Sequence, residues 1–98
     1  MTIEKKQNGT ALLIAVEGRL DTRTAPDLKS ELEASMDGIS DLTFDLSRLE
    51  YLSSAGLHVL LYAQKRMNTQ GKMTVTGCSE EVLEIFQITG FSSILTIK

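Results

Sequence analysis

Residues 10–17 read TALLIAVE, an almost continuous apolar run of the kind that forms a strand buried on both faces. Asn8 and Gly9 come directly before this run, and this dipeptide is a strong signal for a tight hairpin. We therefore expect residues 2–7 to form a strand that pairs antiparallel with the apolar run. This ribbon is the predicted start of the fold.

Strand-like and helix-like segments alternate along the rest of the chain. Residues 24–27 predict a helix start, because Pro26 suits the first turn, Asp27 suits the positive end of the helix dipole, and the Thr24 hydroxyl is expected to cap the Asp27 amide. The order β-β-α-β-α-β-α-β predicts an α/β fold with a mixed, mostly parallel sheet of about five strands and three main helices. We expect strands near residues 2–7, 10–17, 41–46, 73–76 and 94–97, and helices near residues 25–37, 55–70 and 80–89.

The composition limits the possible classes of protein. The 98 residues suit one domain, residues 1–98, and the net charge of −3 argues against nucleic-acid binding through a basic face. One Cys and one His exclude a disulfide framework and an all-Cys/His zinc site. We expect no signal peptide and no membrane span, because no apolar run approaches the roughly 18 residues that a span needs.

Two loops that lead from a predicted strand into a predicted helix are unusually polar: residues 21–24 (DTRT) and residues 51–56 (YLSSAG). In parallel sheets such loops meet at the carboxyl ends of the strands, so we expect Asp21, Ser53, Ser54 and Gly56 to share one surface. A serine hydroxyl at this point can simply cap the helix. Alternatively, a phosphate on Ser54 would lie against free backbone N–H groups at the positive end of the dipole, and Gly56 would allow close approach.

Three motifs at matching separations, GRLD (18–21), FDLS (44–47) and YLSSAGL (51–57), resemble the STAS family, named for sulfate transporters and anti-sigma factor antagonists. Stand-alone proteins of this size resemble the bacterial antagonists. The resemblance implies a cytoplasmic protein, without enzymatic activity or cofactor, that binds an anti-sigma factor and thereby releases a sigma factor. The anti-sigma factor is often a serine kinase that phosphorylates the antagonist, and a PP2C-type phosphatase reverses the modification.

Carried over residue by residue, the resemblance places the phosphorylated serine at Ser54. The family motif commonly has Asp where this chain has Ser53, so Ser53 is a competing acceptor. The partner-binding residues implied by the resemblance are Asp21, Thr22, Asp45, Ser53, Ser54, Gly56 and Leu57.

Other functions remain open at this stage. The runner-up is a STAS interaction module without phospho-control, in a signalling or transport complex, and Ser53 in place of Asp favours it. A hydrolase using Ser54 and His58 is less favoured, because no Gly-x-Ser-x-Gly elbow and no orienting acid accompany the pair. Asp21, Asp45 and Glu50 could chelate a hard cation, although carboxylates near strand ends are common without one.

Overall fold

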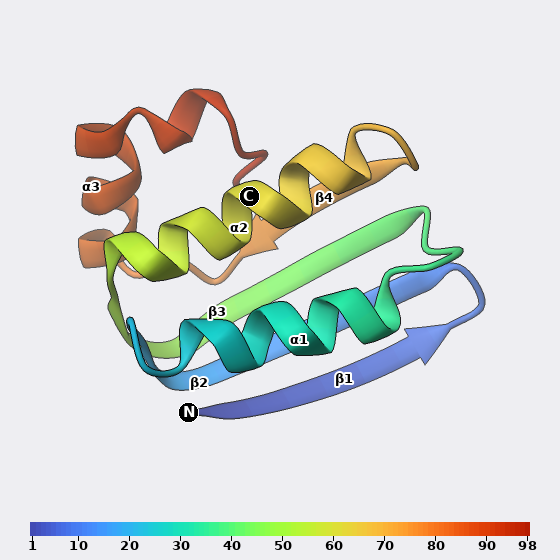
Figure 1. The fold of residues 1–98 in the computed structure, drawn as a ribbon. Coiled ribbons are helices and arrows are strands. Elements are labelled where there is room, and N and C mark those ends of the chain that lie inside the picture. The colour runs from blue at the N-terminus through green and yellow to red at the C-terminus, as the bar shows by residue number, and fades with distance from the viewer.

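The computed structural model describes residues 1–98 as a four-stranded sheet with three α-helices (Figure 1). The spatial strand order is β1-β2-β3-β4, with β1 antiparallel to β2 and the other neighbours parallel. This arrangement confirms the predicted α/β class and the predicted order of the elements up to the third helix. The elements are β1 (Thr2–Asn8), β2 (Ala11–Leu20), α1 (Ala25–Ser35), β3 (Asp41–Leu52), α2 (Ser54–Met67), β4 (Lys72–Thr76), α3 (Glu80–Thr89) and the 3-10 turn η1 (Phe91–Ser93).

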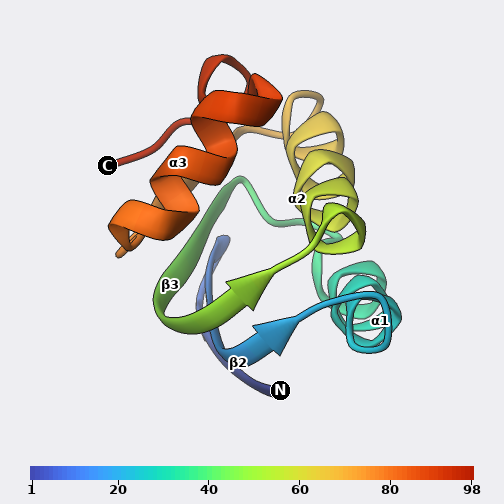
Figure 2. The ribbon, with the colours of Figure 1, turned by 90° about the vertical axis from the view of Figure 1, so that its left-hand side faces the viewer.

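The sheet buries only one of its faces. In β2, Leu12, Ile14 and Val16 are buried, whereas the alternate side chains Leu13 and Ala15 are partly exposed. The prediction that this run is buried on both faces was therefore wrong. Helices α1 and α2 lie next to each other on one side of β2 and β3, so the opposite side of the sheet stays open to solvent (Figure 2).

The core lies between this covered face and the helices. Twenty-four buried apolar side chains form one cluster. Phe44 of β3 and Phe86 of α3 are completely buried in it, and Leu28 and Leu60 enter it from α1 and α2. Helices α1 and α2 thus each bury one face against the sheet.

The predicted fifth strand is reduced to a single bridge between Val75 and Ile97. Gly90, with φ of 82°, ends α3 and is followed by the turn η1, so few residues are left that can run beside β4. Two backbone bonds hold the chain end there: the Val75 N–H donates to Thr96 O, and the Lys98 N–H donates to Val75 O. The β-branched sequence of residues 94–97 favours a strand locally, but the chain path allows only this short contact.

Strand β3 is longer than the predicted 41–46. It continues to Leu52, because its second half pairs with the end of β2 after two register shifts. The neighbouring strand β4 ends at Thr76, opposite Asp45, so it does not run beside the second half of β3. No helix is long and apolar enough to cross a bilayer.

Candidate functional site

The junction between β3 and α2 gives its two serines different environments. Ser53 is the N-cap of α2, and its Oγ accepts a hydrogen bond from the Gly56 N–H at 3.3 Å. Ser54 is the first residue of the helix and is exposed. The capping role that either serine could have is therefore carried out by Ser53, and the Ser54 hydroxyl is left on the surface at the positive end of the helix dipole.

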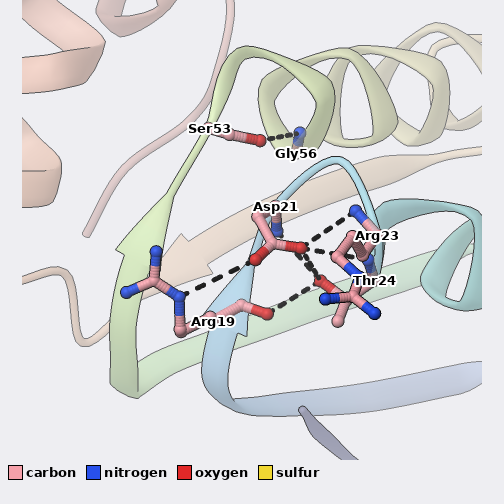
Figure 3. Close-up of polar contacts among 6 residues, drawn as sticks. All are labelled: Arg19, Asp21, Arg23, Thr24, Ser53 and Gly56. Carbon is pink, nitrogen blue, oxygen red and sulfur yellow. Dashed lines mark hydrogen bonds and ion pairs between the residues drawn. The ribbon is translucent and has the colours of Figure 1, made fainter.

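The two polar loops meet at one end of the sheet, as the sequence predicted. The Ser53 N–H donates to the Leu20 carbonyl oxygen at 2.9 Å, which ties the β3–α2 junction to the end of β2. Figure 3 shows Asp21 beside this junction, on the same side as Ser53 and Gly56. The arrangement therefore brings Asp21, Ser53, Ser54 and Gly56 together.

Gly56 lets α2 start close against the sheet. A Cβ atom at this position would lie 2.7 Å from Leu52 Cδ1 and 2.8 Å from Leu20 Cγ, well inside contact distance. The glycine is buried, and so is the neighbouring Leu57. Close helix–sheet packing therefore explains why a glycine stands here, whereas a direct contact of Gly56 or Leu57 with a partner remains a prediction.

The Asp21 carboxylate organises the β2–α1 loop (Figure 3). Its Oδ1 accepts hydrogen bonds from the backbone N–H groups of Arg23 at 3.0 Å and Thr24 at 3.2 Å. The Thr24 hydroxyl accepts from the Asp21 N–H and donates to Arg19 O, so it does not cap Asp27 as predicted. The local loop bonds compete successfully with the helix cap, as short polar side chains often allow.

The environment of Asp21 favours its charged form. Partial burial raises the pKa of this carboxyl, but the bonds from the Arg23 and Thr24 backbone, the Thr24 hydroxyl and the charge of Arg19 outweigh it. The net effect lowers the pKa below its ordinary value of 3.8. A carboxylate is thus held in place beside the start of α2.

This shift predicts how stability depends on pH. A carboxyl whose pKa is lower in the folded chain stabilises the fold above its unfolded pKa, and this contribution disappears as the pH falls through the folded value. We expect Asp21→Asn to unfold more easily than the wild type at pH 7, and the difference to shrink as the pH falls below 3.8 and the Asp21 carboxyl becomes protonated in the folded chain. Urea unfolding across this range measures the difference. A gap between the two proteins that stays constant with pH would contradict the prediction.

A contact that the sequence did not reveal lies at the end of the sheet where Asp21, Ser53 and Ser54 meet, called here the rim. The Arg19 guanidinium stands over the Tyr51 ring, with Cζ 4.2 Å from the centroid, and Arg19 Nε lies 3.7 Å from Asp21 Oδ2. Both side chains are largely exposed, and Arg19 and Tyr51 are register partners on β2 and β3. The register depends on the bulges between these strands, so only the three-dimensional pairing reveals the contact.

Comparison with known proteins identifies the fold and its family. The STAS domain profile matches residues 2–98. The chain belongs to the STAS family. The anti-sigma-B factor antagonist of Listeria monocytogenes is 36% identical over 102 residues, and the alignment covers 100% of this chain and 89% of that protein.

Solved structures show the same STAS architecture. An anti-sigma factor antagonist from Mycobacterium paratuberculosis superposes with a TM-score of 0.88 at 24% identity, and the match covers 98% of this chain and 83% of that one. The Bacillus cell fate determinant SpoIIAA in its phosphorylated form has a TM-score of 0.78 at 14% identity, covering 99% and 91% of the two chains. The STAS fold is therefore shown over the full chain.

The remaining predicted residues of this STAS domain lie at various distances from the rim. Thr22 is exposed in the same loop as Asp21. Asp45 lies earlier on β3, opposite Ala15 and Thr76, on the open face of the sheet rather than beside Ser53 and Ser54. Its Oδ1 accepts from the Ser47 N–H at 2.9 Å, and this bond lowers the pKa of the Asp45 carboxyl.

The geometry favours neither a metal site at the three carboxylates nor a reactive thiol at Cys78. Asp21, Asp45 and Glu50 do not gather into a group that could hold a metal ion. The Cys78 thiol is half-buried, and burial raises its pKa, which disfavours the reactive thiolate.

The Ser53 cap leads to a testable expectation for this STAS domain. We expect Ser53→Ala to lose about 0.5–2 kcal/mol of stability, because the Gly56 N–H loses its acceptor. Ser53→Asp, which introduces the residue common in the family motif, should retain the cap and the wild-type stability. Thermal unfolding of the two variants measures the effect, and equal melting temperatures for Ser53→Ala and Ser53→Asp would contradict the assigned cap.

Proposed function

We propose that this STAS protein is an anti-sigma factor antagonist whose binding is switched off by phosphorylation of Ser54. The observation that carries the proposal is the exposed Ser54 hydroxyl at the first residue of α2, beside a Ser53 hydroxyl that is engaged as the cap. Relatives aligned over the full chain, such as that of Listeria monocytogenes, are named anti-sigma-B factor antagonists. Binding of an anti-sigma factor would release the sigma factor, in the cytoplasm and without catalysis by this chain.

The accessibility of the hydroxyl selects the acceptor. A kinase must bring the γ-phosphate in line with an oxygen that is free to attack, and Ser54 offers such an oxygen on the surface. Ser53 is half-buried, and its modification would take the acceptor of Gly56 N–H away from the helix start. We therefore assign phosphorylation to Ser54, by an anti-sigma factor of the serine-kinase type, and its reversal to a PP2C-type phosphatase.

The phosphate would change the surface without unfolding it. Phosphorylation adds about −1.5 to −2 charge at pH 7, and at Ser54 this charge would lie at the positive end of the α2 dipole. The first N–H groups of a helix lack partners within the helix and can stabilise such a group. The phosphate would add its charge near the Asp21 carboxylate, whose own charge is partly offset by Arg19 at 3.7 Å. A partner fitted to a neutral hydroxyl would then lose affinity through repulsion and desolvation.

One feature supports a second candidate, a STAS interaction module without phospho-control. Ser53 replaces the acidic residue common in the family motif, so a kinase that requires a carboxylate next to its acceptor would not find one here. Such a module would use the same rim of Asp21, Ser53 and Ser54 for constitutive binding in a signalling or transport complex.

Modification by the cognate kinase separates the two candidates. Wild type, Ser53→Ala and Ser54→Ala are incubated with the serine kinase and ATP, and the modified residue is mapped by mass spectrometry. The switch predicts one phosphate in wild type and in Ser53→Ala, and none in Ser54→Ala. Absence of modification in a wild type that still binds the kinase would support the unregulated module, and modification of Ser53 alone would refute the assignment of Ser54.

A further inference from the structure

Two of the exposed strand edges in this sheet are protected. The outer edge of β1 carries Glu4, Lys5 and Lys6, and charged side chains on an edge discourage the addition of another strand. The outer edge of β4 is covered by the end of the chain, because the Val75 N–H donates to Thr96 O at 2.8 Å and the Lys98 N–H donates to Val75 O at 2.9 Å. Both edges are thus poor templates for a further strand.

A third edge lies within β3 and lacks such cover. β4 ends with Thr76 opposite Asp45, and the Ser47 N–H is bound to Asp45 Oδ1. Gly77 packs closely against Ser47, since a Cβ at Gly77 would lie 2.9 Å from Ser47 N, and its φ of 72° turns the chain away from β3. Residues 48–51, called here the open edge, pair with β2 on one side and with no strand on the other.

The open edge presents side chains suited to an interface. Arg48, Glu50 and Tyr51 are exposed, with 43% of the Tyr51 residue surface accessible, whereas Leu49 is buried and anchors the segment. Arg19 stacks on the Tyr51 ring and holds it in place. Tyr and Arg are the residue types that, with Trp, dominate binding energy at protein interfaces. An exposed aromatic ring, with Arg19 on one face, thus stands at the carboxyl end of the open edge.

The open edge is continuous with the proposed switch, because it leads through Leu52 directly into Ser53 and Ser54. We propose that the anti-sigma factor adds an extended segment to the open edge, with main-chain hydrogen bonds to residues 48–51 and an apolar side chain packed on Tyr51. This mode of recognition takes affinity from the main chain and specificity from alternate side chains. The inference rests on the proposed function and adds to it the part of the surface that the partner occupies.

Strand addition also explains why a phosphate at Ser54 would matter to the partner. The phosphate would be attached three residues after Tyr51, beyond the carboxyl end of the open edge. A docked segment would then place its own carbonyl oxygens, and any acidic side chain, near the added dianion. Repulsion by the phosphate, and the cost of removing water from it, would therefore weaken the binding of this segment before any other part of the partner.

Nuclear magnetic resonance of the complex tests the pairing directly. The partner used is an anti-sigma factor whose binding has first been measured by titration. In its complex, we expect the amide hydrogens of residues 48–51 that point away from β2 to exchange with solvent at least about tenfold more slowly. Backbone-to-backbone nuclear Overhauser contacts between residues 48–51 and the partner should appear. The outward amides of β1 serve as the internal control and should not change. A bound complex with no such contacts at residues 48–51, or with contacts along β1 instead, would overturn the inference.

Substitution of Tyr51 tests the side-chain anchor. We expect Tyr51→Ala to weaken binding of the anti-sigma factor by about tenfold or more, and Tyr51→Phe to bind within about twofold of the wild type because it keeps the ring. Lys6→Ala, on the protected β1 edge, is the matched surface control, and circular dichroism checks the fold of each variant. Wild-type affinity for a folded Tyr51→Ala would refute the anchor. If the wild type itself does not bind, the proposed function fails and the inference fails with it.

Discussion

Phosphorylation of Ser54 is expected to lower the affinity for the anti-sigma factor by about 100-fold or more. Juxtaposition of like charges across an interface costs several kcal/mol, and each 1.4 kcal/mol corresponds to about a factor of ten in affinity. Circular dichroism of the modified protein should match that of the unmodified one, because the start of α2 can accommodate the charge. Calorimetric titration of both forms at two salt concentrations measures the effect. The loss should be smaller at high salt, since ions screen exposed charges.

Three variants separate the charge from the loss of the hydroxyl. Ser54→Ala should bind about as tightly as the wild type and should not respond to kinase and ATP. Ser54→Asp should bind with intermediate affinity, because one carboxylate has about half the charge of the phosphate. Ser53→Ala, whose hydroxyl serves the helix cap, should lose affinity only to the extent that it loses stability. Equal affinity of phosphorylated and unmodified protein would refute the switch.

Gly56→Ala is expected to destabilise the fold by about 1–3 kcal/mol, although alanine is the better helix former by about 1 kcal/mol. The added methyl group would lie 2.7 Å from Leu52 Cδ1, 2.8 Å from Leu20 Cγ and 3.0 Å from Leu20 O. The two leucines are fully buried, so α2 must move away from the sheet to make room. For a domain of this size, each kcal/mol lowers the melting temperature by about 4–8 °C.

Gly56→Val should be still less stable, since it adds volume at the same crowded point. Ser54→Ala is the matched control in the same helical turn, because its side chain faces solvent and its substitution should leave the melting temperature within about 3 °C. Thermal unfolding followed by circular dichroism ranks the variants. A Gly56→Ala protein as stable as the wild type would show that α2 is not held against Leu20 and Leu52 as described.

The sequence was sufficient wherever local signals decide the structure. Helix α3 spans residues 80–89 as predicted, because Ser79 caps it through the Val82 N–H and Gly90 ends it in a left-handed conformation. The meeting of Asp21 with Ser53 was also predictable, since the ends of adjacent parallel strands share an edge.

Long-range pairing decided the features that the sequence did not predict. The consecutive polar residues Ser47 and Arg48 break the apolar–polar alternation after Leu46, yet residues 48–51 extend β3 because the end of β2 lies beside them. The contact of Arg19 with Tyr51 depends on the register shifts within that same pairing. The Thr24 cap was wrong because Asp21 and Arg19, brought close by the loop, offer the threonine hydroxyl nearer partners.

The two ends of this mixed sheet differ in how well they tolerate changes of sequence. The hairpin turn at Gly9 lies at the end of the sheet opposite to Ser54, and a Cβ there would meet no atom within 4 Å (Figure 1). Insertions and drift in sequence are tolerated best at such roomy, exposed turns. A fluorescent or affinity label inserted after Gly9 is therefore expected to leave the far end of the sheet, with Asp21, Ser53 and Ser54, unperturbed.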